Sequence, residues 1–263
     1  MAEVVIVEDG DAAGALVAET IVSLIRTKPD AVLGLATGST PLASYRALSD
    51  RIAQEDIDVH RVRGFALDEY VGIAAGHPQS YRSVITREVV EPLGLTPELV
   101  HVPNGDPATI RTAGAAYEAA IEAAGGIDLQ ILGIGRTGHL GFNEPGSSLA
   151  SLTRAKMLAE STRADNARFF DSPDDVPLHC ITQGIGTILR ARRLVLLAFG
   201  EVKARAVAAA VEGPVSASQP GSAIQLHPNT TVIIDEAAAS QLAGLDYYRR
   251  AWANRAAVQG SQR

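Results

Sequence analysis

Cysteine is almost absent from this sequence, which has a single one, Cys180, among 263 residues. One cysteine cannot form an internal disulfide, so the chain suits a reducing compartment and we expect it in the cytoplasm. Long apolar runs are absent as well, since no stretch reaches the roughly 18 apolar residues of a membrane helix. The first residues lack the basic and apolar segments of an export signal. We therefore expect neither membrane insertion nor secretion.

Basic residues are outnumbered by acidic ones. The chain has 23 Lys and Arg against 30 Asp and Glu, and its formal net charge is −7. Nucleic-acid backbones are bound by clustered Lys and Arg, so we do not expect nucleic acid as a partner. A small phosphate ligand remains compatible with this balance, because a few local cations or a helix N-terminus can bind it.

Apolar residues make up 46% of the chain, which is enough for one substantial core. Six short runs rich in Val, Ile and Leu read as buried strands: 4–7, 32–36, 62–67, 128–135, 194–200 and 230–234. Helical patterns lie between them over 12–26, 41–54, 108–124 and 203–212. The alternation predicts an α/β fold with a single-domain, mostly parallel, doubly wound (Rossmann-like) sheet and helices on both faces. We expect the domain to span 1–246 and a C-terminal tail to span 247–263.

Ligands of such sheets bind beyond the carboxyl ends of the strands, so the loops after the strands carry the candidate site. The first of these loops reads Thr37-Gly38-Ser39-Thr40-Pro41 and precedes a predicted helix. Free backbone N–H groups and hydroxyls in that position can bind a phosphate. An ordinary strand-to-helix turn with a hydroxyl cap fits the residues equally well.

Two adjacent acids follow the third predicted strand, in Leu67-Asp68-Glu69-Tyr70. Neighbouring carboxylates at a strand end are costly unless they are solvated, paired or functional. Metal binding, general-base catalysis and capping of a following helix all fit this pair. The residues alone leave the three alternatives open.

Glycines dominate the loop after the fourth predicted strand, where residues 133–138 match G-x-G-x-x-G. A dinucleotide fingerprint needs a helix that begins inside it and an acid about 20 residues further on. Here Gly141 and Pro145 follow and break helices, so we reject that interpretation. The glycines instead allow an irregular loop to bring His139 and Glu144 to a ligand, which favours an acid/base site.

Two cations complete the candidate site. Arg168 can hold a phosphate through two parallel hydrogen bonds, and Lys203, just after the fifth predicted strand, can act as a point charge. Taken alone, Arg168 or Lys203 would be assigned to the solvated surface. A binding role is favoured only because the three loops described above accompany them. The remaining histidines show no metal-ligand spacing, and we expect no metal and no cofactor.

Together these segments resemble the glucosamine-6-phosphate deaminase (glucosamine-6-phosphate isomerase) family. The matching segments are Thr37 to Pro41, Leu67 to Gly72, His77 to Tyr81, Gly138 to Pro145, Asn166 to Asp171, and Val211 to Gly213. A related family, the 6-phosphogluconolactonases, shares the Gly-x-x-Gly-His loop. That family continues the loop with small and apolar residues, whereas this chain has Asn143-Glu144 and carries Asp68-Glu69-Tyr70. The resemblance therefore favours the deaminase.

The resemblance implies that glucosamine 6-phosphate and water become fructose 6-phosphate and ammonia, a reaction of amino sugar metabolism and of N-acetylglucosamine catabolism. In class terms it implies an isomerase-like aminohydrolase, that is, a hydrolase acting on a C–N bond. His139, assisted by Glu144, would open the sugar ring, and Asp68 would abstract the C2 proton to give an enediol-type intermediate. The implied phosphate contacts are Gly38, Ser39, Thr40, Arg168 and Lys203.

One position departs from the family pattern. Many members place an Asp two residues before the histidine, where this chain has Thr137. A hydroxyl can hydrogen-bond the imidazole but cannot offset imidazolium charge as a carboxylate would. We expect an altered ring-opening step, in which Glu144 alone supplies the charge that supports His139.

Some members of the family are hexamers that N-acetylglucosamine 6-phosphate activates at an intersubunit site. The matching positions here are Ser147, Ser148, Arg154 and Lys156, and Met157 stands where a hydroxyl is common. The resemblance thus implies a candidate allosteric site and a homo-oligomer. Besides the deaminase, the sequence leaves two further hypotheses: a lactonase of the same fold and a non-catalytic sugar-phosphate sensor.

Overall fold

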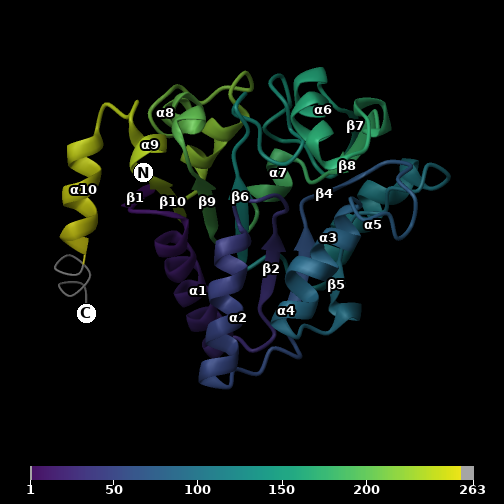
Figure 1. Ribbon diagram of the computed structural model, residues 1–263, viewed down its shortest axis with the longest axis horizontal. Helices are drawn as coiled ribbons and strands as arrows, with labels where there is room; N and C mark the ends of the chain where they lie inside the picture. Colours follow the sequence, from purple (N-terminus) through teal and green to yellow (C-terminus); the bar gives the residue numbers. More distant parts are fainter. Residues whose placement is uncertain (1, 256–263) are drawn as a thin grey trace.

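Within residues 2–255, which the computed structural model describes, seven parallel strands form the main sheet in the order β1-β10-β9-β6-β2-β3-β5 (Figure 1). The strands are β1 (Glu3–Val7), β2 (Val32–Leu35), β3 (Arg63–Ala66), β5 (Val100–His101), β6 (Leu129–Gly133), β9 (Leu194–Ala198) and β10 (Thr230–Asp235). All six predicted strands are present. The two-residue strand β5 was not predicted, because so short a segment carries no apolar pattern of its own.

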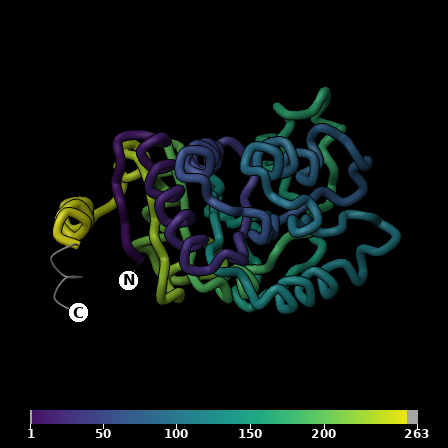
Figure 2. The backbone as a smooth tube through the Cα atoms, turned by 90° about the horizontal axis from the view of Figure 1, so that it is seen from below, coloured from purple at the N-terminus to yellow at the C-terminus, as the bar shows by residue number. Residues whose placement is uncertain are grey.

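Helices cover both faces of this sheet, as predicted. Figure 2 shows α1 and α2, in purple and blue, on one side and the teal helix α5 on the other. The helices are α1 (Gly10–Thr27), α2 (Leu42–Glu55), α3 (Tyr81–Ile85), α4 (Glu91–Leu93), α5 (Ile110–Ala123), α6 (Glu160–Asn166), α7 (Ile185–Ile188), α8 (Ala204–Val211), α9 (Glu236–Ala239) and α10 (Leu245–Ala253). A π-helical turn, η1 (Thr86–Val90), and 3-10 segments η2 (Pro97–Leu99), η3 (Ala167–Phe169), η4 (Pro173–Asp175), η5 (Glu201–Lys203) and η6 (Pro220–Leu226) join them.

A second, antiparallel sheet was not predicted. It has the order β4-β8-β7 and consists of β4 (Asp68–Tyr70), β8 (His179–Thr182) and β7 (Arg154–Met157). Strand β4 lies where we expected a loop, and its three residues Asp68, Glu69 and Tyr70 are all buried. No local pattern predicts a strand of two acids and a tyrosine, because its pairing partners are about a hundred residues away in the chain.

Two apolar clusters hold the two sheets. The larger follows the seven parallel strands, where residues such as Val5, Ile131 and Leu196 are completely buried. The smaller lies beside the antiparallel sheet and consists of Tyr70, Phe142, Leu158, Val176 and Cys180. Burial raises the pKa of the Cys180 thiol, which donates to the backbone oxygen of Lys156. Cys180 therefore packs as a small apolar group in this cluster.

The order in which strands are added to the sheet reverses between β2 and β6, which are neighbours in the sheet. From β2 the chain continues to β3 on one side, whereas from β6 it reaches β9 on the other. Loops that leave such a pair diverge and open a crevice, which is where doubly wound sheets bind ligands. The loop after β2 is the predicted phosphate loop, and the loop after β6 carries His139.

The predicted tail begins inside a helix. Residues 247–253 belong to α10, which packs beside β1 (Figure 1). Residues 256–263 lie outside the described residues, so the division into domain and tail stays a prediction. In the described part of the chain, no helix combines the length and apolarity required to span a bilayer.

Candidate functional site

A cavity of about 450 Å³ opens at the crevice between β2 and β6, and most of the predicted site residues line it. They are Gly38, Ser39, Thr40, Asp68, His139, Arg168 and Lys203. Five segments far apart in the sequence thus meet at one place, and four of them follow strands of the parallel sheet, as the strand-end argument predicted. Glu144 and Thr137 lie behind His139 in the described structure and support its ring.

Asp68 forms the buried side of the cavity. The residue is 5% exposed at the start of β4, which pairs with β8. Burial, and secondly the charge of Glu69, raise the pKa of Asp68 to about 8. Loss of water disfavours the ionised form, so near neutral pH this carboxyl accepts and releases a proton easily. A carboxyl with these properties suits general-base chemistry.

Glu69 has a different task. Its Oε1 accepts the backbone N–H groups of Tyr70 and Tyr81 at 2.8 and 2.9 Å, and its Oε2 accepts that of Arg82 at 3.0 Å. Tyr81 and Arg82 begin α3, whose first N–H groups have no partner inside the helix. Of the alternatives open for the acid pair, helix capping thus describes Glu69, and it leaves Asp68 free to face the cavity.

His139 is held from behind by a hydroxyl and a carboxylate. Thr137 Oγ1 lies 2.9 Å from His139 Nδ1 and donates to Glu144 Oε2 at 3.0 Å, while Nδ1 lies 3.3 Å from the same Oε2. Both neighbours of Nδ1 then act as acceptors, which assigns the proton of the neutral ring to Nδ1 and leaves Nε2 unprotonated.

Both carboxylate oxygens of Glu144 are bound, since the Thr162 hydroxyl donates to Oε1. Burial alone raises the pKa of Glu144, but the hydrogen bond and charge of His139 and the bonds from Thr162 and Thr137 lower it to about 2. Glu144 is therefore a stable anion beside the imidazole. The sequence missed Thr162, because it lies on α6 and nothing local links it to the loop after β6.

Two glycines make room for this arrangement. A Cβ at Gly135 would lie 2.1 Å from Cε1 and Nε2 of His139, so the imidazole packs directly against the backbone there. Gly141 has φ +55°, and a Cβ there would lie 3.1 Å from Oδ2 of Asp68. Gly135, which belongs to the apparent dinucleotide fingerprint, and Gly141, which follows it, thus allow close approach of the site's own side chains.

The phosphate-binding candidates line the same cavity as Asp68 and His139. Gly38 adopts φ +92° in an exposed turn, and Ser39 and Thr40 follow it before α2. Lys203 donates from Nζ to the backbone oxygen of Ile134 at 2.7 Å, and burial lowers its pKa. Arg168 is exposed and stacks over the Phe169 ring at 4.6 Å from its centroid. Hydroxyls, backbone N–H groups and cations that line one cavity are the groups with which proteins bind anions.

Three aromatic side chains that the sequence did not predict as site residues also line the cavity: Tyr70, Tyr81 and Phe142, here called the aromatic wall. The Tyr70 and Tyr81 rings lie 5.0 Å apart, and the Tyr81 and Phe142 rings stack at 5.9 Å. The side-chain amide of Asn166 fixes this wall by donating to the Tyr70 hydroxyl at 2.9 Å. Single aromatic residues in separate segments gave no periodic signal, although Tyr70, Tyr81 and Phe142 all lie in family-matching segments.

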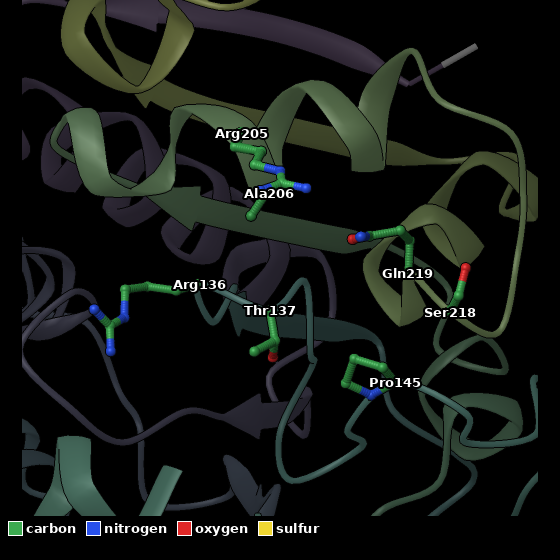
Figure 3. A pocket seen from close by; sticks show the side chains of 7 residues that line it. All are labelled: Arg136, Thr137, Pro145, Arg205, Ala206, Ser218 and Gln219. Atoms are coloured by element: carbon green, nitrogen blue, oxygen red, sulfur yellow. The ribbon is translucent and has the colours of Figure 1, made fainter. Parts of the chain in front are cut away.

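A second cavity, of about 320 Å³, lies next to the loop after β6. Thr137 and Pro145 line it, together with Arg205 and Ala206 of α8 and Gln219 (Figure 3). Thr137 therefore has a hydrogen-bonded network on one side and a cavity on the other.

The four predicted effector residues lie outside the main cavity. Lys156 donates from Nζ to the Ser147 hydroxyl at 2.9 Å, and Arg154 donates to Asn143 Oδ1 at 2.7 Å. Ser148, the residue after Ser147, is exposed to solvent. Arg154 is thus joined to the residue that immediately precedes Glu144. The structure brings Ser147 and Lys156 together, and their use as an effector site stays a prediction.

Comparison with known proteins agrees with this geometry. A family model described as glucosamine-6-phosphate isomerases/6-phosphogluconolactonase matches residues 9–233. The chain belongs to this family.

Relatives within this family are similar over nearly the whole chain. A glucosamine-6-phosphate deaminase of Bifidobacterium longum (strain DJO10A) is 60% identical, over 99% of this chain and 100% of its own. The deaminase of Streptomyces coelicolor is 57% identical, over 98% and 99%. A solved structure of a monomeric glucosamine-6-phosphate deaminase has a TM-score of 0.88 at 39% identity, covering 91% of this chain and 99% of its own.

Lactonase structures in this family are more distant. The 6-phosphogluconolactonase of Trypanosoma brucei has a TM-score of 0.73 at 18% identity, covering 92% of this chain and 99% of its own. That likeness shows a shared fold. At the level of sequence, the deaminases are the more similar branch.

Proposed function

We propose that this chain is a glucosamine-6-phosphate deaminase, which converts glucosamine 6-phosphate and water to fructose 6-phosphate and ammonia. The observation that carries the proposal is the buried Asp68 carboxyl, which shares one cavity with His139 and a cationic end. The names of relatives that are 57–60% identical support the same reaction. The reaction consumes water and breaks a C–N bond, so it is formally hydrolytic, whereas its central steps are those of an isomerase.

The non-reacting phosphate anchors the substrate in this proposal. Backbone N–H groups and hydroxyls of Gly38, Ser39 and Thr40, with Arg168 and Lys203, hold it at the cationic end of the cavity. An anchor at C6 fixes the distance of C1 and C2 from Asp68 and removes translational freedom before the chemistry begins.

Ring opening is the work of His139. Its unprotonated Nε2 takes the proton of the C1 hydroxyl, and the proton is returned to the ring oxygen as the C1–O5 bond breaks. Glu144 stabilises the imidazolium formed between these two transfers, because its own charge persists to low pH. Thr137 fixes the tautomer of His139 by accepting a hydrogen bond from its Nδ1–H group.

Isomerisation and deamination follow on the open chain. The Asp68 carboxylate removes the C2 proton, and the electron pair forms the C1=C2 bond. The aldehyde oxygen takes a proton from the substrate's own C2 ammonium group, which gives the enediol-type intermediate bearing a neutral amino group. Asp68 then delivers its proton to C1, and C2 becomes an imine. Water adds at C2 and ammonia leaves, so the products are fructose 6-phosphate and ammonia.

The proposal extends to regulation and cellular place. Ser147, Ser148, Arg154 and Lys156 would bind N-acetylglucosamine 6-phosphate, in a hexamer where a neighbouring subunit completes the site. One similar structure is described as monomeric, so the mass of the assembly in solution tests this part by itself. We place the reaction in the cytoplasm, because a lone buried cysteine suits a reducing compartment.

The decisive experiment measures ammonia and fructose 6-phosphate released from glucosamine 6-phosphate by the purified protein. Stoichiometric release of both products supports the proposal. Binding of the sugar phosphate without turnover would identify a sensor instead. Hydrolysis of 6-phosphogluconolactone in place of deamination would identify a lactonase.

A further inference from the structure

Arg136 is a cation of the cavity for which the sequence suggested no role. It lies on the loop after β6, next to Thr137, and lines both cavities, but only in the 450 Å³ cavity does it share the lining with Arg168 and Lys203. Its side chain is 58% exposed. In Figure 3 the Arg136 guanidinium points away from both Thr137 and Gln219, two other residues of the second cavity.

The guanidinium is held by an acid from another element. Arg136 Nη2 donates to Asp165 Oδ1 at 2.5 Å, and Asp165 belongs to α6, one turn before Arg168. Asp165 lines the same cavity and is 46% exposed. An ion pair between two such exposed side chains contributes little stability, so it exchanges readily for a stronger partner.

These charges are close to one another. The charge of Asp165 raises the pKa of Lys203, and those of Arg136 and Arg168 lower it. Three cations and one anion leave this part of the cavity with a net positive charge, which suits a phosphate dianion. Lys203 already donates to Ile134, so the arginines supply the forked donors that suit phosphate oxygens.

We infer that Arg136 is a further phosphate-binding residue, and that Asp165 holds its guanidinium in the empty site and releases it as the phosphate binds. The inference rests on the proposed function in taking the ligand to be a sugar phosphate. Asp165 thereby competes with the ligand for Arg136. The pair keeps the arginine ordered near the site and also weakens the affinity for weakly bound anions.

Binding of inorganic phosphate, measured by calorimetry at low salt, tests the inference without any turnover. Arg136→Gln should weaken binding about fivefold or more, because a charge-assisted bond to the phosphate is lost. Asp165→Asn should tighten it about two- to fivefold, because a competing exposed carboxylate is removed. Arg205→Gln is the matched control: it removes an arginine of the second cavity and should leave phosphate affinity unchanged.

The double variant separates competition from simple repulsion. If Asp165 acts by holding Arg136, Asp165→Asn should have little effect on phosphate affinity in the Arg136→Gln background. A gain of equal size in both backgrounds would overturn the inference. So would a weakening by both single variants, which is the result expected if the pair merely ties the loop to α6.

Failure of the inference about Arg136 can be told apart from failure of the proposed function, because different measurements test them. Ammonia release by the unaltered protein tests the function, whereas the sign of the two phosphate shifts tests Arg136. In the active enzyme, Arg136→Gln should raise KM for glucosamine 6-phosphate about fivefold or more while kcat changes less than twofold. A variant that lowers kcat and leaves KM unchanged would contradict a binding role for Arg136.

Discussion

The Thr137 hydroxyl donates to Glu144 Oε2 at 3.0 Å, and its oxygen lies 2.9 Å from Nδ1 of His139. A threonine thus stands between the carboxylate and the imidazole, in a position where many family members carry an acid. Its hydroxyl links Glu144 and His139 through two hydrogen bonds, but it adds no charge of its own. The first prediction concerns this position.

Thr137→Val should lower kcat about tenfold, because His139 and Glu144 both lose a hydrogen bond and the tautomer is no longer fixed by two acceptors. Thr137→Ser keeps the hydroxyl and serves as the control. Thr137→Asp adds a second carboxylate that favours the imidazolium, so the pH–rate profile should shift to higher pH. Identical profiles for the native protein and Thr137→Asp would show that position 137 does not tune the ring-opening step.

Asp68→Asn should abolish isomerisation and stabilise the fold at neutral pH. The pKa of Asp68 is about 8 in the folded state, above its unfolded value, so the unfolded chain loses this proton first and stability falls as pH rises from about 4 toward 8. An asparagine avoids this loss, and we expect a gain of about 1–3 kcal/mol at pH 7. Urea denaturation and the ammonia assay measure the two effects.

The matched control for this change is Asp50→Asn, at an exposed position of α2. It should leave both stability and turnover unchanged. In the native protein, kcat/KM should rise with pH and level off above about pH 8, as the Asp68 carboxyl ionises. Full turnover by Asp68→Asn would assign the base to another residue.

Glu69→Gln should destabilise the protein by about 1–2 kcal/mol, because an amide nitrogen cannot accept the N–H groups that Glu69 now caps. It should also move the kcat/KM profile to lower pH, since the Glu69 charge helps to raise the pKa of Asp68. Glu122→Gln, exposed on α5, is the control for both measurements. An unshifted profile would mean that Glu69 has no electrostatic influence on the base.

Glu144→Gln should reveal a contribution to stability that depends on pH. The pKa of Glu144 is about 2 in the folded state, below its unfolded value, so the contribution is complete above about pH 4.5 and disappears as pH falls toward 2. The difference in urea midpoint between native protein and variant should shrink over that range. A difference that is constant from pH 6 to pH 3 would exclude this origin.

N-acetylglucosamine 6-phosphate should change the velocity curve for glucosamine 6-phosphate, and Lys156→Gln should remove the response by deleting a phosphate-binding charge. Arg111→Gln, exposed on α5, leaves the candidate effector residues intact and should respond as the native protein does. A hyperbolic curve that the effector leaves unchanged in the native protein would refute the proposed regulation.

The sequence predicted the frame of this molecule because the relevant signals are local. Strands buried on both faces, such as β2, β6 and β9, need continuous apolar residues, and their order between helices implies a parallel sheet. Strand ends in such a sheet share one edge, so the loops with Ser39, Asp68 and His139 were predicted to meet. Family resemblance then supplied the expected role of each.

What each polar side chain does at that edge was decided by contacts that the sequence does not contain. Asp68 and Glu69 are chemically alike, yet burial isolates the first while the N–H groups of α3 bind the second. Arg136 reads as a surface residue until Asp165, from another element, stands beside it in the cavity. Local patterns determine where strands end, whereas pKa values and partners depend on solvent exclusion and on neighbours that only the folded chain brings together.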